Sequence, residues 1–294
     1  MSYRDGGYFR TEVHSTRRLT PHMVRIRFSG GDLPEFRSSG QADECIGITF
    51  PAPGSRVSPD PVLTAGTWGH PEDAAVRVYS VRHWDAEKAV LTVDFVVHEG
   101  GIAAAWAMDA RVGDSVVLHG PDGWYRIPAD TDWQLLVADM TGLPALGRIV
   151  EELPAGARAH VIAEIVEGGD IQPLRTAATV TYEWITGSGN GHAPSALTDA
   201  VRRHPLPPGR GYVWFAGEAA PSREVRKLVR REWGWEHSRF TVLGYWRVAK
   251  EEWLARYREL APDLADRHAE ALAAGTSHEV ADEMFEEELE RVGL

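Results

Sequence analysis

The segment Arg77-Val78-Tyr79-Ser80-Val81-Arg82 is followed by Asp94-Phe95-Val96-Val97-His98 and then by Gly100-Gly101-Ile102-Ala103-Ala104-Ala105-Trp106. Residues 76–82 alternate between two faces and residues 91–97 form an apolar run, so both segments predict β-strands. The two glycines end the second strand, and the alanine-rich residues 102–107 predict a short helix. A strand, a glycine turn and a helix N-terminus suit a pyrophosphate. This arrangement indicates a flavin nucleotide site, although it also occurs in proteins that bind no nucleotide.

Length and composition favour two domains in a protein of the reducing cytoplasm. The chain has 294 residues, about twice the length of a typical domain. Its one cysteine, Cys45, cannot form an internal disulfide, and its first residues lack the apolar core of a signal peptide. No apolar run approaches the roughly 20 residues that cross a bilayer, so we expect no membrane insertion. The net charge of −12 argues against a nucleic-acid partner, because polyanions are bound by clustered Lys and Arg.

The first 125 residues predict a β-barrel or a β-sandwich. Short apolar runs alternate there with turns rich in Gly, Pro and Asp, as expected of many short strands. The predicted strands are residues 22–28, 45–50, 76–81, 91–97 and 115–118. Residues 51–71 contain several Pro and Gly without a clear period and predict a surface loop, either plain or close to the flavin.

The second half predicts a parallel sheet covered by helices on both faces. Apolar runs at residues 134–138, 159–165, 180–185 and 212–216 alternate with helical patterns at 144–153, 194–203 and 222–233. Ligands of such sheets bind at the carboxyl ends of the strands. The residues expected there are Asp139, Thr141, Thr186, Gly187, Gly217 and Glu218. No G-x-G-x-x-G follows the first strand, so the residue pattern alone supports a nicotinamide site only weakly. Residues after 250 predict two or more helices.

The combined motifs resemble the siderophore-interacting protein family of FAD-dependent ferric-siderophore reductases. Further matches are Gly120-Pro121-x-Gly123, Asp139-x-Thr141-x-Leu143-Pro144-Ala145, Trp214-x-Ala216-Gly217-Glu218 and Gly244-Tyr245-Trp246-Arg247, in the family's order over roughly residues 8–247. The resemblance implies a two-domain ferredoxin-reductase-like fold. Residues 1–128 would form an N-terminal antiparallel β-barrel that binds FAD, and residues 129–247 a C-terminal α/β domain with a parallel sheet, of the NAD(P)H-binding type. Residues 248–294 would form a helical C-terminal extension.

The resemblance also implies a set of cofactor-binding residues. Arg77 would neutralise the FAD diphosphate, Tyr79 would stack against the isoalloxazine, and Ser80 would hydrogen-bond near its N5 atom. The full set of FAD contacts would be Arg77, Val78, Tyr79, Ser80, Asp94, Val96, His98, Gly101, Ile102, Ala103, Ala104, Trp106, Asp139, Thr141 and Leu143. Asp139 could equally serve as a helix N-cap, and both interpretations stay open. Ala216, Gly217 and Glu218 would contact a nicotinamide.

The reaction that the resemblance implies is transfer of electrons from NADH, NADPH or ferredoxin through FAD to Fe(III) in a siderophore. No catalytic side chain and no metal bound by the protein is expected. Arg247, Arg126 and Arg82 would contact the siderophore, with stacking on Trp246 as the alternative for Arg247. Ferredoxin docking would need a basic face, for which a predicted helix offers Arg223, Arg226, Lys227, Arg230 and Arg231. A solvated helix face is the other interpretation of these five residues.

Four positions depart from the family pattern, one of them Gly142 in place of an alanine. Gly47 replaces a common lysine, which would suit a neutral hydroxamate complex better than an anionic catecholate. Ile102 replaces a proline, and Met140 replaces a carboxylate beside the predicted adenine site. Two other classes of function therefore remain open: a flavoenzyme of the same fold with another acceptor, such as free flavin, a quinone or a natural-product intermediate, and a non-catalytic protein that binds flavin or siderophore.

Overall fold

The structure is a computed structural model, and it describes residues 7–98 and 101–248 together with residues 256, 257, 285, 288, 289 and 291. Contacts divide the chain into one compact unit, Met1–Tyr245, and a second one, Trp246–Leu294. The helices predicted after residue 250 lie almost wholly outside the described residues. None of the helices in the described part of the chain combines the length and apolar character needed to span a bilayer.

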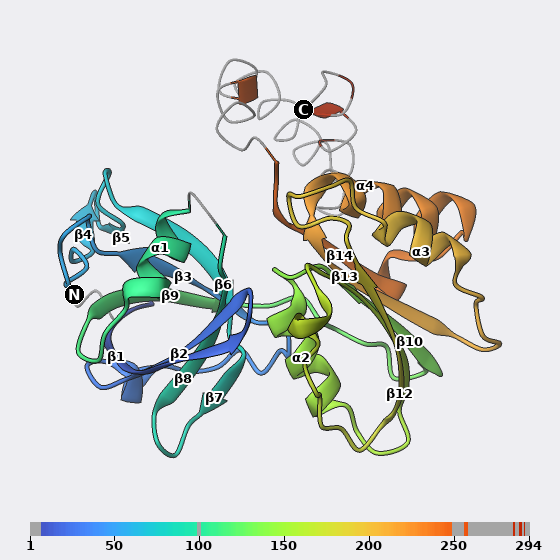
Figure 1. The fold of residues 1–294 in the computed structure, drawn as a ribbon, viewed down its shortest axis with the longest axis horizontal. Coiled ribbons are helices and arrows are strands. Elements are labelled where there is room, and N and C mark those ends of the chain that lie inside the picture. Colours follow the sequence, from blue (N-terminus) through green and yellow to red (C-terminus); the bar gives the residue numbers. More distant parts are fainter. Residues whose placement is uncertain are drawn as a thin grey trace. The chain divides into compact units, whose positions relative to one another are not determined.

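The first half of the larger unit forms an antiparallel sheet that curls around one core (Figure 1). Within the described residues the sheet has seven strands, in the order β6-β3-β9-β1-β2-β8-β7. They are β1 (Tyr8–Thr20), β2 (Met23–Ser29), β3 (Cys45–Phe50), β6 (Ala75–Ser80), β7 (His83–Asp85), β8 (Val90–Val96) and β9 (Ser115–Asp122). The predicted antiparallel architecture is confirmed, while β1 and β7 were not among the predicted strands.

Apolar side chains on the inner face of this sheet hold it together. Ile26, Ile48 and Phe95 come from three different strands and are fully buried in one cluster. Helix α1 (Ile102–Asp109) packs Ala103 and Ala107 against the same cluster. The small alanine side chains let the helix approach the sheet closely, so the residues after the glycine turn lie next to β8.

The surface loop predicted over residues 51–71 contains an element that the sequence did not indicate. This segment contains a hairpin formed by β4 (Val62–Thr64) and β5 (Thr67–Gly69). Its turn places Ala65 and Gly66 at φ values of 50° and 83°, as in the turns that match the twist of paired strands. Three residues per strand gave too short a pattern to recognise.

The second half forms a parallel sheet with strand order β12-β11-β10-β13-β14 in the described chain. The strands are β10 (Trp133–Ala138), β11 (Arg158–Ile165), β12 (Thr179–Thr186), β13 (Gly211–Glu218) and β14 (Phe240–Trp246). Pairs β10–β11, β11–β12 and β10–β13 are parallel, as predicted. The helices are α2 (Leu143–Glu152), α3 (Leu197–Arg203) and α4 (Ala219–Lys227), and α4 continues as a π-helical turn, Leu228–Glu232. Strand β14 was not predicted.

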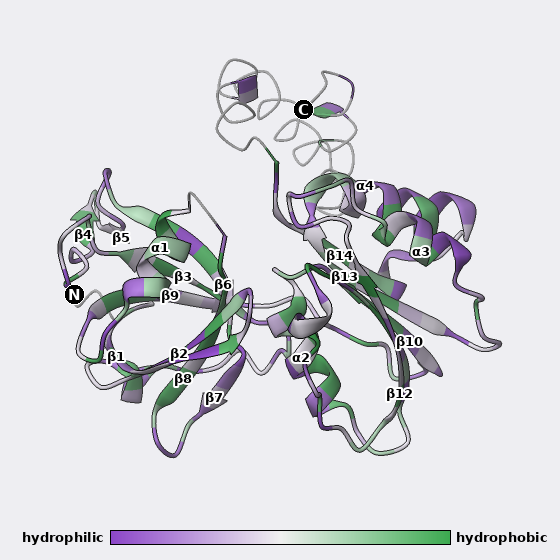
Figure 2. Ribbon diagram, in the orientation of Figure 1, coloured by the Kyte–Doolittle hydropathy of each residue, from purple (hydrophilic) through white to green (hydrophobic). Residues whose placement is uncertain are grey.

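Alternate residues of β10 pack against helices on opposite faces of this sheet. Leu136 and Ala138 belong to the core that includes α2, whereas Leu135 and Val137 belong to the core that includes α3 and α4. The ribbons of α3 and α4 accordingly alternate between hydrophilic and hydrophobic residues (Figure 2). A strand buried on both faces explains why residues 134–138 are continuously apolar.

A buried aspartate connects the two halves. Asp170, in the short 3-10 helix η3 (Gly168–Asp170), accepts hydrogen bonds from the Thr20 hydroxyl at 2.7 Å and from the backbone N–H of His22 at 3.0 Å. The His22 ring lies 2.8 Å from the second carboxylate oxygen. Nothing in the sequence indicated this contact, because the two partners lie 148 residues apart.

These bonds predict a pH dependence of stability. Burial alone would raise the pKa of Asp170, but the bonds from Thr20, His22 and Glu167 outweigh burial and lower it. A lowered pKa means that the ionised carboxylate stabilises the fold above the usual pKa, and that this contribution is lost as pH falls through the lowered value. In urea unfolding, the free energy of unfolding of wild type should therefore exceed that of Asp170→Asn by a constant amount above about pH 5. The difference between the two free energies should shrink below about pH 4. A difference that grows on acidification would contradict the assignment.

Candidate functional site

Strand β6 presents three of the predicted flavin residues in different environments. Arg77 is exposed, and its guanidinium donates to the carbonyl oxygen of Val76 at 2.8 Å. Val78 is 67% exposed. Tyr79 packs between aromatic rings, with its centroid 4.5 Å from that of Phe95 and 6.2 Å from that of Phe50. Burial raises the pKa of Tyr79, with a smaller opposing effect from Arg77, so the phenol is neutral at physiological pH.

Two buried hydroxyl groups converge at the end of β6. In the described part of the chain, neither the hydroxyl oxygen of Ser80 nor that of Tyr245 has a hydrogen-bond partner other than the second hydroxyl of this pair. Burial raises the pKa of Tyr245; Asp43, Cys45 and Asp139 raise it further, and nearby Ser80 lowers it. These effects place the Tyr245 hydroxyl near both Ser80 and Asp139. A buried polar atom without a partner is costly, so this pair of hydroxyls suits a ligand with polar edges.

Tyr245 was missed as a site residue. It belongs to the quoted motif Gly244-Tyr245-Trp246-Arg247, but the sequence offered no reason to place it beside Ser80, 165 positions earlier in the chain. Membership of this motif was the one feature of the sequence that could have identified Tyr245 as a site residue.

The turn into α1 is shaped by a glycine. A Cβ atom added to Gly101 would lie 2.7 Å from the His98 ring, so a side chain there would displace His98. His98 is exposed and Ile102 is 50% exposed, whereas Ala103 and Ala104 are buried against the barrel. Only the backbone of these alanines can therefore face a ligand. The Trp106 ring packs edge-on against Phe50 at 5.1 Å and contributes to the barrel core.

Asp94 and Arg82 are used in a buried ion-pair network. The Asp94 carboxylate accepts two hydrogen bonds from Arg25, at 2.6 and 2.7 Å, and its side chain is completely buried. Arg82 pairs with Glu151 of α2 at 2.7 Å and is 7% exposed. The Asp94 and Arg82 side chains therefore bind other protein groups in this structure. Val96 similarly packs against the core of the α/β half.

The turn between β10 and α2 satisfies its own amide groups. One Asp139 carboxylate oxygen accepts the backbone N–H of Thr141 at 2.8 Å, the Thr141 hydroxyl at 2.6 Å and the N–H of Gly142 at 3.3 Å. The Leu143 N–H bonds the Asp139 carbonyl oxygen, and the Leu143 side chain is buried. Asp139 thus caps the turn itself, whereas the N-cap position of α2 is Gly142, so the interpretation of Asp139 as the helix N-cap is wrong in detail.

The remaining amide of this turn reaches a distant loop. The Met140 N–H donates to the side-chain oxygen of Asn190 at 3.0 Å, and the Asn190 amide donates to the Glu164 carbonyl oxygen at 3.2 Å. The Glu164 carboxylate in turn accepts bonds from Ser188, Ser195 and the Ala196 N–H. This loop is therefore held over the carboxyl ends of β10 and β11, and His192 within it is exposed.

Met140 and Gly142 explain the packing of the same turn. The Met140 side chain is fully buried in the core with α2. The family's carboxylate at this position is thus replaced by an uncharged side chain that packs in the core. A Cβ atom at Gly142 would lie 2.3 Å from the carbonyl oxygen of Ala216, so only glycine permits this contact. Ala216 and Gly217 are buried and Glu218 is half-buried, which brings the end of β13 against the turn.

The remaining predicted substrate arginines differ in placement. Arg126 is exposed in the connection between the halves, and Arg247 belongs to the second unit, where it is half-buried. The five basic residues at α4 are not one exposed face: Arg226 donates to the Val242 carbonyl oxygen at 2.7 Å, and Lys227 pairs with Glu224 at 3.3 Å. Of the five, Arg231 is the exposed one.

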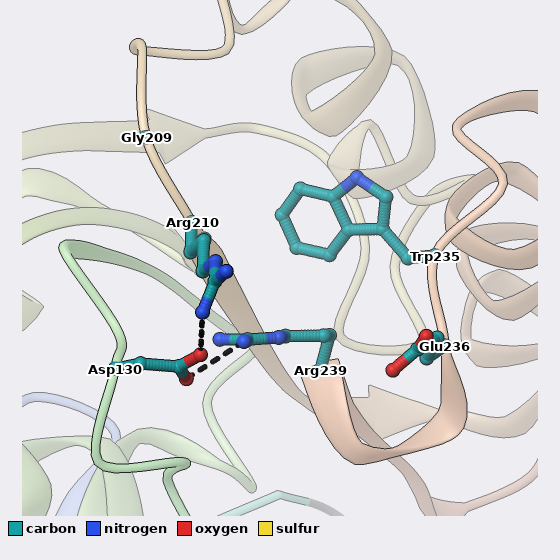
Figure 3. A pocket seen from close by; sticks show the side chains of 7 residues that line it. Asp130, Gly209, Arg210, Trp235, Glu236 and Arg239 are labelled. Atoms are coloured by element: carbon teal, nitrogen blue, oxygen red, sulfur yellow. Dashed lines mark hydrogen bonds and ion pairs between the residues drawn. The ribbon is translucent and has the colours of Figure 1, made fainter.

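A pocket of about 490 Å³ lies where β13 begins, at the end of the strand away from residues 216–218. Arg210 and Arg239 converge on the Asp130 carboxylate, and Trp235 forms the facing wall (Figure 3). Gly211, where β13 begins, lines this pocket, whereas the predicted nicotinamide residues follow the end of β13. Asp130 already pairs with both guanidinium groups, so we assign the pocket a structural role.

Cys45 carries no thiolate chemistry in this arrangement. It is paired in register with Ser80, and burial raises its pKa to about 12, with Asp122, Asp43 and Glu44 acting in the same direction. A protonated, buried thiol is a poor nucleophile. Cys45 is therefore not a candidate redox or nucleophilic residue of this site.

These features fit a flavin. The Ser80 and Tyr245 hydroxyls without further partners, the exposed Arg77 and the glycine at position 101 provide donors, a cation and a close backbone approach. The fold is ferredoxin-reductase-like: the crystal structure of a ferredoxin–NADP⁺ reductase from Neisseria gonorrhoeae is similar with a TM-score of 0.57 at 12% identity, over 82% of this chain and 99% of that one.

The chain belongs to the siderophore-interacting protein family. Residues 12–125 match the family model of the siderophore-interacting FAD-binding domain, and residues 131–249 match the siderophore-interacting protein model. FAD is therefore its cofactor. A siderophore utilization protein from T. fusca, whose crystal structure is known, shares 32% sequence identity with this chain. The two structures superpose with a TM-score of 0.74 over 82% of this chain and 93% of that one.

Two characterised relatives are reductases by name. The ferric vibriobactin reductase ViuB of Vibrio cholerae is 28% identical over 238 residues, 80% of this chain and 87% of its own length. The NADPH-dependent ferric-chelate reductase of Escherichia coli is 28% identical over 233 residues, 78% of this chain and 89% of its own length. These similarities support an oxidoreductase.

Proposed function

We propose that the protein is an FAD-dependent ferric-siderophore reductase of the cytoplasm that takes electrons from NADPH or NADH. The observation that carries the proposal is the pair of buried Ser80 and Tyr245 hydroxyls, one from each half of the unit, which have no protein partner beyond each other in the described residues. The proposal assigns residues 1–128 to FAD, residues 129–247 to the donor and residues 248–294 to a helical extension. Relatives named as ferric reductases support the acceptor class.

The protein's own residues would bind and orient the reactants. Bound FAD supplies the redox chemistry, because it accepts a hydride and releases electrons one at a time. Arg77 would neutralise its diphosphate, the Tyr79 ring would contact its aromatic system, and the Ser80 hydroxyl would donate to its polar edge. Fe(III) is substrate, and siderophore oxygens hold Fe(II) much less strongly, so reduction releases the metal.

A nicotinamide donor is favoured over ferredoxin. The five basic residues at α4 do not form an exposed face, and the chain is acidic. A ferredoxin, which is itself usually acidic, would therefore find little complementary charge there. The backbone N–H groups of the Asp139 turn already donate hydrogen bonds within the protein. We therefore expect the nicotinamide donor to contact residues 216–218 and not this turn.

An anaerobic titration tests the proposal. The purified protein should show a flavin absorbance spectrum that bleaches with NADPH or NADH and recovers on addition of a ferric hydroxamate, as an Fe(II) chelator traps the product. A flavin that neither nicotinamide reduces would overturn the donor assignment. A flavin that is reduced but is reoxidised only by quinones or free flavin would identify another acceptor. Protein without flavin that does not take up added FAD would contradict the proposal altogether.

Gly47 offers a test of siderophore charge. It lies opposite Val78 of β6 and His119 of β9, and a Cβ atom there would have its nearest neighbours at 3.7 Å, an ordinary contact. Gly47→Lys should raise kcat/KM several-fold for an anionic ferric catecholate and leave a neutral ferric hydroxamate nearly unchanged, because the added cation attracts the anion. The gain should shrink at high ionic strength. Gly47→Gln is the uncharged control, and an equal gain with both complexes would contradict the prediction.

A further inference from the structure

Two consecutive carboxylates, Asp43 and Glu44, are completely buried immediately before β3. Buried charges are costly unless they are paired and hydrogen-bonded, so their partners show what they hold in place. The next residue, Cys45, is the register partner of Ser80. Both carboxylates therefore lie beside the strand end that carries the proposed flavin contact.

Glu44 and Arg148 attach helix α2 to this strand end. The Glu44 carboxylate accepts a bond from Arg148 at 2.8 Å, and the same guanidinium nitrogen donates to the Val81 carbonyl oxygen at 3.1 Å. The Val81 N–H donates to the Glu44 carbonyl oxygen at 2.8 Å. Ser38 and Ser39 complete the set of donors to the carboxylate. Arg148 is 7% exposed, so this contact is shielded from water.

Asp43 attaches β13 and the connection between the halves to the same point. One of its oxygens accepts the backbone N–H groups of Trp124 and Tyr125 at 2.9 and 2.8 Å. The other accepts the indole N–H of Trp214 at 3.1 Å. Trp214 precedes Ala216 and Gly217, the residues proposed to contact the donor, by two and three positions.

The close approach of α2 also depends on a glycine. A Cβ atom at Gly147 would lie 3.3 Å from the Nε of Arg82, tighter than most such contacts. Arg82 itself pairs with Glu151 on the next turn of α2. The helix that follows the Asp139 turn is thus fixed to Val81 and Arg82, the two residues after Ser80.

We infer that Asp43, Glu44 and Arg148 are positioning residues that set the distance between the flavin held at Ser80 and the donor held at the carboxyl edge of the α/β sheet. The inference rests on the proposed function for its kinetic consequence. Transfer between two bound groups depends steeply on their alignment, and a displacement of about 1 Å can cost up to a hundredfold in rate. The three residues touch neither reactant and act through Ser80, α2 and β13.

Glu44→Gln, Arg148→Gln and Arg148→Lys test the inference kinetically, with Arg158→Lys as the control for an exposed arginine of the same half. Stopped-flow absorbance should show the rate constant of flavin reduction at saturating NADPH falling by about tenfold in Arg148→Gln. Reoxidation by the ferric complex and FAD occupancy should stay near wild type, and Arg148→Lys should recover part of the loss. Equal losses in both half-reactions, or a reduction rate constant that equals wild type, would overturn the inference.

A distance measurement tests the inference independently of the donor. Spin labels at Lys88→Cys and Arg203→Cys, both exposed positions, would report the separation of the two halves, since the native Cys45 is buried and resists labelling. The distance distribution should broaden or shift in Glu44→Gln/Arg148→Gln and remain as in wild type in Arg158→Lys. An unchanged distribution in the double variant would overturn the inference. Failure of NADPH and NADH to reduce the wild-type flavin would instead overturn the donor assignment alone.

Discussion

Asp94→Ala is expected to lower the free energy of unfolding by about 3 to 5 kcal/mol, the effect typical of removing one partner from a buried ion pair. The Asp94 carboxylate accepts both Arg25 bonds, at 2.6 and 2.7 Å, and lies 3.9 Å from Arg82. Its removal leaves the Arg25 guanidinium without its partner in a largely buried position. Urea unfolding of the apoprotein, monitored by tryptophan fluorescence, measures the loss.

A surface pair in the same barrel provides the matched control. Lys88→Ala removes the exposed partner of Asp85 and should change the unfolding free energy little, because ion pairs with an exposed partner are screened by water. Asp94→Leu combined with Arg25→Met should recover much of the loss, since an apolar pair replaces a buried charge pair without leaving a single charge. If Asp94→Ala instead kept wild-type stability and lost FAD affinity, Asp94 would be a direct flavin contact.

Local patterns predicted most of the architecture. The apolar run at residues 134–138 defines β10 because a strand buried on both faces needs apolar side chains at every position. Strand β3 coincides with the predicted residues 45–50. Strands β7 and β14 were missed for a different reason: a three-residue strand shows no period, and β14 lies within a segment dominated by its aromatic motif.

The candidate site was harder to predict because its geometry depends on partners far apart in the sequence. Arg82 and Asp94 have the residue types of ligand-binding groups, and only the positions of Glu151 and Arg25 show that they pair within the protein. Asn190 and Tyr245 present the reverse case, since each acquires its significance from a residue in another part of the fold. Residue type and spacing identify candidates, and burial and partners then separate ligand contacts from structural pairs.

Arg77→Ala is expected to weaken FAD binding by about 1.5 to 3 kcal/mol, the range for a lost charge-assisted hydrogen bond. This corresponds to a dissociation constant about 10 to 150 times higher. The guanidinium of Arg77 is exposed and makes a short bond to the Val76 carbonyl oxygen of its own strand, so it can turn to a phosphate without breaking the core. Titration of apoprotein with FAD, followed by the quenching of flavin fluorescence, measures the change.

Thermal unfolding with and without FAD separates a lost contact from a damaged fold. Because Arg77 is exposed, apoprotein of Arg77→Ala should unfold at nearly the wild-type temperature, while the stabilisation gained from saturating FAD should be smaller at equal FAD concentration. Arg27→Ala, an exposed arginine of β2 in the same sheet, should leave both quantities unchanged. An Arg77→Ala variant that retains wild-type FAD affinity would show that the diphosphate is held elsewhere, with the backbone turn at Gly101 as the next group to test, since that turn would then supply the phosphate donors alone.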